Sequence, residues 1–212
     1  MKDIPALFKD RTFLKLFLGA VVLLAAALII NFYAGTYATK SESNYVTDII
    51  LSNIPVFDVD AVFIYGGYAL VAIVLLVCFA MPRRMPFTIK AIALFYVIRS
   101  IFVTLTHIAP FPTHIVVDAS SLIHLFDFDG ELFFSGHTGL PFLMALLYWD
   151  NKYLRVGFIA LSVFLGAVVL MGHVHYSIDV FSAFFITYAI YGIAEQVFKK
   201  DKEFGNAATL LP

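Results

Sequence analysis

The chain has 212 residues, of which 61% are hydrophobic and only 14% are charged, and its mean hydropathy is +0.90. A water-soluble domain is about half apolar and about a quarter charged, so this composition indicates a protein embedded in a bilayer. The formal net charge of -1 gives no sign of nucleic-acid binding, and the single cysteine, Cys78, excludes an intramolecular disulfide and a CxxC metal or redox site.

Six apolar stretches are each expected to form a helix that crosses the membrane, for which about 20 residues are needed. The predicted spans are 13–33, 61–81, 91–109, 138–149, 156–172 and 176–198, the fourth of them short unless residues 132–134 extend it. Before them, the spacing of Ile4, Leu7 and Phe8 favours a short amphipathic helix over residues 1–12. We therefore expect an all-α integral membrane protein, with one six-helix transmembrane catalytic domain over 13–198 and a tail over 199–212.

Lysine and arginine orient the predicted bundle. Twelve of the 14 basic residues lie in the N-terminal segment up to Lys15, in the second and fourth connections or in the tail, whereas the opposite connections carry Lys40 alone. Cytoplasmic segments are rich in basic residues, so both termini are predicted to be cytoplasmic. The remaining basic residue, Arg99, lies inside the third span.

Histidines and most acidic residues of the second half gather at the opposite ends of the spans. They are His107, His114, His124, His137, His173 and His175, with Asp118, Asp127, Asp129, Glu131 and Asp179. Ionisable groups close to the hydrocarbon are costly and usually mark function, so the active site is expected on the non-cytoplasmic side.

The stretch HVHYSID, residues 173–179, places His175 at the start of the sixth span and Asp179 one helical turn later. An aspartate at this spacing can accept a hydrogen bond from one imidazole nitrogen and leave the other free to attack or to take a proton. The helix start also offers backbone N–H groups that suit a phosphate. A polar pair that locks two helices together is the alternative interpretation.

The stretch FFSGHT, residues 133–138, also predicts a helix start that carries a histidine. Ser135 can cap a helix, Gly136 allows close backbone approach, and His137 falls in the first turn. A second histidine at a second helix start suggests an acid/base partner for His175. A helix cap with a histidine at a helix interface is the ordinary alternative.

Together, Ser-Gly-His followed by His-x3-Asp on six spans resembles the type 2 phosphatidic acid phosphatase superfamily. The phosphatases' Lys-x6-Arg-Pro motif is not found, and Val169 stands where they have an arginine. The chain is similar instead to the sphingomyelin synthase branch, because GELFFSGHT (130–138) and HVHYSIDV (173–180) resemble its Gly-Asp-x3-Ser-Gly-His-Thr and His-x-His-Tyr-x2-Asp-Val motifs. RSIFVTLTHIAPFPTH (99–114) resembles its third-span motif with one extra residue; Glu131 replaces the usual Asp, and Val174 a residue that is often acidic.

This resemblance implies transfer of a phospho-head-group, of the phosphocholine or phosphoethanolamine type, from a phospholipid to a lipid alcohol such as ceramide or diacylglycerol. His175 would be the nucleophile that forms a phosphohistidine, with Asp179 as its orienter. His137 would protonate the departing diacylglycerol and then deprotonate the incoming hydroxyl. Neither a metal ion nor another cofactor is expected, because helix N-termini and nearby cations can hold the phosphoryl charge.

The candidate substrate-binding residues are Arg99, Glu131, Ser135, Gly136, Tyr176 and His173. Arg99 is the leading cation, and an ion pair with Glu131 or Asp179 is the alternative for it. The expected partners are a phospholipid donor, a lipid-alcohol acceptor and the surrounding lipids, with no nucleic acid, and the sequence leaves room for a homo-oligomer.

Two other functions remain open at this point. A lipid phosphate phosphatase or phospholipase C-like hydrolase would use the same phosphohistidine with water as the acceptor. An ion or metal transporter of another class would use His107, His137, His173, His175 and Asp179 as ligands. Transporters usually place such groups at mid-membrane in repeated halves, and this chain has neither feature.

Overall fold

The computed structural model describes residues 7–115 and 132–207. In these residues all the regular secondary structure is helical. The helices are α2 (Arg11–Lys40), α3 (Asp60–Ala80), the short 3-10 helix η1 (Pro82–Arg84), α4 (Met85–Leu105), α5 (Gly136–Leu147), α6 (Lys152–Met171), α7 (Ser177–Val197) and α8 (Lys199–Asn206).

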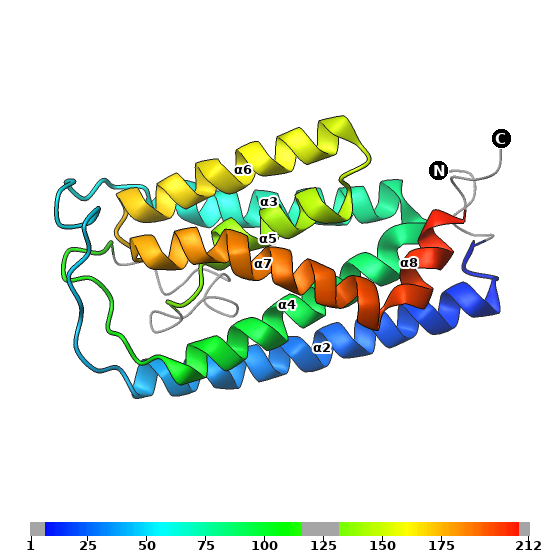
Figure 1. The fold of residues 1–212 in the computed structure, drawn as a ribbon, viewed down its shortest axis with the longest axis horizontal. Helices are drawn as coiled ribbons and strands as arrows, with labels where there is room; N and C mark the ends of the chain where they lie inside the picture. Colours follow the sequence, from blue (N-terminus) through cyan, green and yellow to red (C-terminus); the bar gives the residue numbers. More distant parts are fainter. Residues whose placement is uncertain (1–6, 116–131, 208–212) are drawn as a thin grey trace.

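Helices α2 to α7 run alternately up and down one bundle (Figure 1). At one end α3, α5 and α7 begin and α2, α4 and α6 end; we call it the histidine end, because it carries His107, His137 and His175. The opposite end, where α2 begins and α8 lies, is called the basic end. The side of the membrane that each end faces stays a prediction from the basic residues.

Within residues 7–115 and 132–207, five helices are long and apolar enough to cross a membrane: α2, α3, α4 joined to η1, α6 and α7. These indicate an integral membrane protein. The remaining predicted span, the fourth, corresponds to α5, which has only 12 residues and so a length of about 18 Å, well short of a hydrocarbon core about 30 Å thick. The expectation of six helices that each span the bilayer is therefore not confirmed, although α5 occupies the expected place between α4 and α6.

The helix bounds differ from the predicted spans where polar residues continue a helix. Helix α2 runs to Lys40, seven residues beyond the predicted end, and α4 begins at Met85 with Pro86 in its first turn, a position that tolerates proline. Residues 1–6 of the predicted amphipathic helix lie outside the described residues. Residues 7–10 lead into α2, which is capped by Asp10 through a 2.8 Å hydrogen bond from the Thr12 N–H.

Helices α2 and α4 pack along each other. The face that α2 buries carries small side chains at seven-residue spacing, Ala20, Ala27 and Ala34. Without a hydrophobic difference between lipid and protein, such small residues associate helices by allowing close van der Waals contact. The other faces of the bundle expose large apolar side chains, for example Leu76 and Phe185, as expected of surfaces in contact with lipid.

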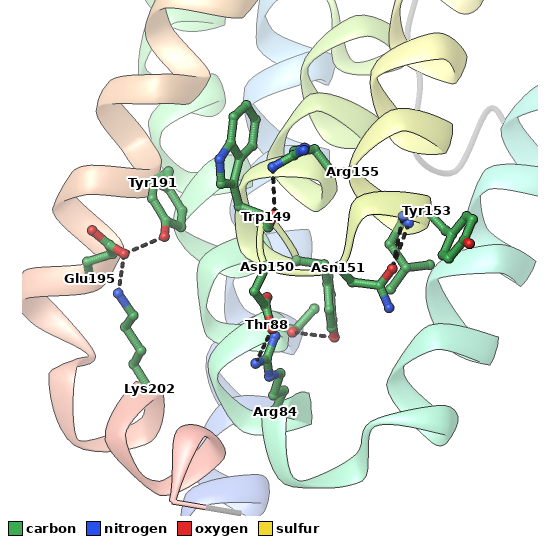
Figure 2. A network of polar contacts seen from close by, with 12 residues as sticks. Arg84, Thr88, Trp149, Asp150, Asn151, Tyr153, Arg155, Tyr191, Glu195 and Lys202 are labelled. Carbon is green, nitrogen blue, oxygen red and sulfur yellow. Dashed lines mark hydrogen bonds and ion pairs between the residues drawn. The ribbon is translucent and has the colours of Figure 1, made fainter. Parts of the chain in front are cut away.

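A polar network fixes the basic end (Figure 2). Arg84 donates two hydrogen bonds to Asp150, of 2.7 and 2.8 Å, and Thr88 is hydrogen-bonded to Tyr148 at 2.9 Å. These bonds join η1 and α4 to the short connection between α5 and α6. They hold the far end of α5, the helix whose first turn carries His137.

Helix α8 belongs to the same end of the bundle and lies against η1 and the start of α4. The residues of α8, Lys199–Asn206, belong to the segment 199–212 that the sequence analysis predicted as a tail. Lys90 of α4 forms an ion pair of 2.6 Å with the buried Asp201, and Lys202 binds Glu195 of α7, which also accepts a hydrogen bond from Tyr191. Tethers to α4 and α7 therefore hold α8 in place.

Candidate active site

Ser135 caps the start of α5, as the sequence predicted. Its Oγ accepts a hydrogen bond from the Thr138 N–H at 3.4 Å, and the residue is fully buried. His137 lies in the first turn of this helix, half-buried, at the histidine end. The short Ser-Gly-His segment is thus a helix start that presents an imidazole.

His175 and Asp179 form the predicted pair at the start of α7. The Nδ1 atom of His175 lies 3.5 Å from Oδ2 of Asp179, and both side chains are almost completely buried. This separation is at the outer limit of a hydrogen bond, so Nδ1 faces the carboxylate without forming a hydrogen bond to it. The same Oδ2 accepts a 2.9 Å hydrogen bond from the Tyr176 N–H, which fixes the carboxylate.

The two motifs are joined directly. The Ser135 N–H donates a 3.1 Å hydrogen bond to the backbone carbonyl of Asp179, so the first turns of α5 and α7 are adjacent. His137 follows Ser135 by two residues, and His175 precedes Asp179 by four. The structure therefore confirms that the two histidines come from neighbouring helix starts at the same end of the bundle.

Arg99 enters this region from α4. It is 3% exposed, and its Nε donates a 3.0 Å hydrogen bond to the carbonyl of Phe134, immediately before the Ser-Gly-His segment. The guanidinium also faces Gly136, where an added Cβ would lie 3.6 Å from Nε. Arg99 exerts a Coulombic attraction on Asp179 as well, so the cation expected from the sequence lies between the two motifs.

Phe63 of α3 contacts His137, and no sequence pattern predicts this contact. Its ring centroid lies 4.2 Å from that of His137, with the two planes 32° apart, and Phe63 is 1% exposed. The phenyl ring is therefore one wall for the imidazole. Only the fold brings these residues together, since 74 positions separate them in the sequence.

Tyr176 and His173 bind the connections beside the site. The hydroxyl of Tyr176 donates to the carbonyl of Ala109 at 2.8 Å, and Nδ1 of His173 lies 2.7 Å from the hydroxyl of Thr113. Burial lowers the pKa of His173 below the ordinary value, although Asp48 attracts a proton to it. In this structure both side chains hold the α4–α5 connection, and substrate binding by them stays a prediction.

His173 also terminates α6. Its φ of 55° is in the left-handed region, its N–H binds the carbonyl of Leu170, and the next N–H, of Val174, binds the carbonyl of Val169. These two bonds define a Schellman motif, in which glycine is the usual residue at the left-handed position. Here the left-handed position carries a histidine, whose side chain is bound to the hydroxyl of Thr113.

The other predicted residues have separate surroundings. His107 packs against Tyr37, with ring centroids 5.2 Å apart, and Nδ1 of His114 is hydrogen-bonded to the carbonyl of Phe111 at 2.7 Å. Glu131 lies outside the described residues, together with His124, Asp118, Asp127 and Asp129. Among residues 7–115 and 132–207, no group of three or more His, Cys, Asp or Glu side chains is arranged to hold a metal ion.

Asp48, in the connection between α2 and α3, is the main residue that the sequence did not reveal. Its carboxylate accepts hydrogen bonds from the N–H and the hydroxyl of Ser177, each 2.7 Å long. The prediction that the start of α7 offers unpaired N–H groups to a phosphate is therefore wrong for two of them, because Asp179 takes that of Tyr176 and Asp48 takes that of Ser177.

Residues 130–196, about a third of the chain, match the family described as PAP2 superfamily C-terminal. No curated protein and no solved structure matches the chain significantly. The matched segment contains α5, α6 and α7 with both histidine motifs. It supports the type 2 phosphatidic acid phosphatase superfamily, and with it the chemistry of a phosphatase or a phosphotransferase.

Proposed function

We propose that this membrane protein transfers a phospho-head-group from a phospholipid to a lipid alcohol, in the manner of a sphingomyelin synthase. The observation that carries the proposal is the junction of the two helix starts, where the Ser135 N–H binds the carbonyl of Asp179 and His175 lies 3.5 Å from the Asp179 carboxylate. Two histidines, a carboxylate and a buried arginine at one place suit phosphoryl transfer.

In the first step His175 attacks the phosphorus atom of the donor through Nε2, because Nδ1 faces Asp179. The bond from phosphorus to the diacylglycerol oxygen breaks, and that oxygen takes a proton from His137. The product of this step is diacylglycerol and a head-group phosphoryl group on His175. Arg99 would neutralise the charge that grows on the equatorial oxygens.

In the second step His137 removes the proton of the acceptor hydroxyl, whose oxygen attacks phosphorus. The bond from phosphorus to Nε2 breaks, and the head group leaves on ceramide or diacylglycerol. His175 is only 2% exposed, so the lipid phosphate must displace side chains that cover it before the first step. Water in place of the lipid hydroxyl would make the same protein a hydrolase.

The family match favours phosphoryl chemistry over the transporter hypothesis. The choice of transfer over hydrolysis, and of a non-cytoplasmic site, is supported by the motif resemblance and by the distribution of basic residues. The proposed donors are phosphatidylcholine and phosphatidylethanolamine.

The test is to incubate the purified protein with these two phospholipids and either ceramide or diacylglycerol, and to weigh the products by mass spectrometry. We expect the head group on the acceptor, and free head-group phosphate when no acceptor is added. His175→Ala and His137→Ala should abolish both products, while His114→Ala, a histidine bound to a loop carbonyl, should retain them. Activity in either of the first two variants would overturn the mechanism, and release of head-group phosphate alone would favour the hydrolase.

A further inference from the structure

Asp48 is a buried carboxylate held by four hydrogen bonds. Oδ1 accepts the N–H groups of Ile50 and Leu51 at 2.8 and 3.0 Å, and Oδ2 accepts both the N–H and the hydroxyl of Ser177 at 2.7 Å. Asp48 is 8% exposed. A carboxylate with two donors on each oxygen is satisfied by the protein alone and keeps no oxygen for a ligand.

This carboxylate is ionised at neutral pH. Burial raises the pKa of Asp48, but the hydrogen bonds from Leu51, Ser177 and Ile50 outweigh it, so that the pKa lies below the ordinary value. A negative charge is also favoured at this position, because Ser177 is the first residue of α7 and the N-terminus of a helix carries positive partial charge. The two hydrogen bonds from Ser177 to the charged Asp48 thus tie the α2–α3 connection to α7, and we call them the Asp48 clamp.

Ser177, the residue that Asp48 binds, lies in the sequence between His175 and Asp179. Ser177 follows His175 by two positions and precedes Asp179 by two. The residue before it, Tyr176, is held by its own N–H on Asp179 and by its hydroxyl on the carbonyl of Ala109. Without the Asp48 clamp, the turn that sets the distance from His175 to Asp179 would keep its anchors at Tyr176 and at the Asp179 carbonyl, but would lose the one midway between His175 and Asp179.

We propose that Asp48 is a positioning residue for the transfer reaction, which fixes the first turn of α7 so that His175 is aimed at phosphorus. This inference rests on the proposed function. Asp48 touches neither the substrate nor the imidazole, so its removal should slow formation of the phosphohistidine without changing which lipids bind. Misplacement of a reacting group by about 1 Å costs on the order of 100-fold in rate.

Asp48→Asn tests the clamp with little change in volume. The amide oxygen can still accept from Ile50 and Leu51, but the amide nitrogen would then meet the N–H of Ser177 as donor against donor. Ser177→Ala is the milder variant, since it removes one hydrogen bond and keeps the backbone one. Asp58→Asn is the matched control, because Asp58 lies in the same connection and is exposed.

The experiment is a rapid-quench single turnover with phosphatidylcholine radiolabelled in its phosphate, which yields the rate constant and the amplitude of labelled protein. We expect full amplitude with a rate constant lowered about 10- to 100-fold in Asp48→Asn, a smaller loss in Ser177→Ala, and the wild-type rate constant in Asp58→Asn. A role in folding alone would lower the amplitude and leave the rate constant unchanged, and that result would overturn the inference.

Should Asp48→Asn give no folded protein, Ser177→Ala decides the question by the same two quantities. A wild-type rate constant in Ser177→Ala at full amplitude would then refute the clamp. Labelling of wild type shows that the phosphohistidine step of the proposed function takes place, whatever the variants do. An absence of label in wild type with both phosphatidylcholine and phosphatidylethanolamine refutes the proposed function itself, and the clamp with it.

Discussion

Gly139, two residues after His137, is a point of close approach between α5 and two other helices. A Cβ at this position would lie 2.8 Å from a ring carbon of Phe95 on α4 and 2.8 Å from the hydroxyl oxygen of Thr187 on α7. Both neighbours are fully buried, so neither can turn away. We therefore predict that Gly139→Ala separates the three helices and moves His137 relative to His175.

The magnitude follows from the contact distances. Ordinary contacts between carbon atoms begin at about 3.5 Å, so Phe95 and Thr187 must each lie about 0.7 Å further from the new Cβ. Overpacking of this kind costs about 1–3 kcal/mol of unfolding free energy. Alanine returns about 0.5–1 kcal/mol through its better helix propensity. The expected net loss of stability is on the order of 1–2 kcal/mol, with a transfer rate lowered by more than the stability loss implies, because the acid/base group has shifted.

The assay is thermal unfolding in detergent beside head-group transfer at fixed lipid concentration. Gly192→Ala is the control, since a Cβ there meets nothing within 4 Å and should leave the protein as stable or more stable. Phe95→Leu in the Gly139→Ala background should recover part of both quantities. Wild-type stability and rate in Gly139→Ala would show that α5 is not wedged between α4 and α7 as described.

Two further predictions concern the ends of the bundle. Arg84→Met removes the hydrogen bonds to Asp150, but the pair is partly exposed, so the loss in unfolding free energy should be only about 0.5–1 kcal/mol and should vanish in an Asp150→Asn background. His173 is buried with a pKa below its ordinary 6.5, so the unfolded chain takes up a proton first and stability should fall as the pH drops through that value. His173→Gln should flatten the decrease in Tm between about pH 8 and about pH 5, and an unchanged slope would contradict the assignment.

The parts of the site that depend on local spacing were predictable from the sequence. The i, i+4 relation placed Asp179 beside His175, and the order Ser-Gly-His placed a cap at Ser135 before a helical His137; both arrangements are found. Arg99 was expected either at a phosphate or in an ion pair. It is bound to the Phe134 carbonyl and also attracts Asp179.

The parts that depend on packing across the bundle were not predictable. Asp48 and Ser177 are 129 positions apart, and an aspartate before Ile-Ile-Leu in a connection has no pattern that singles it out. Phe63 is one of 23 phenylalanines, most of which would serve equally well against lipid. Among the described residues, the apolar composition predicted the places of α2 to α7, and the predicted fourth span, 138–149, is as short as the 12-residue α5. That this segment crosses the membrane is not confirmed, because hydrophobicity alone does not show whether a helix is long enough to span it.

The hydrogen bond from Ser135 to the carbonyl of Asp179 has a consequence for how a lipid could arrive. Moving α5 and α7 apart would break that bond and would also separate the two imidazoles. A phosphate that entered between these helices would therefore find His137 and His175 too far apart to act together. A lipid phosphate that leaves this bond intact must instead reach the imidazoles from the histidine end, past the connections that Asp48, His173 and Tyr176 hold.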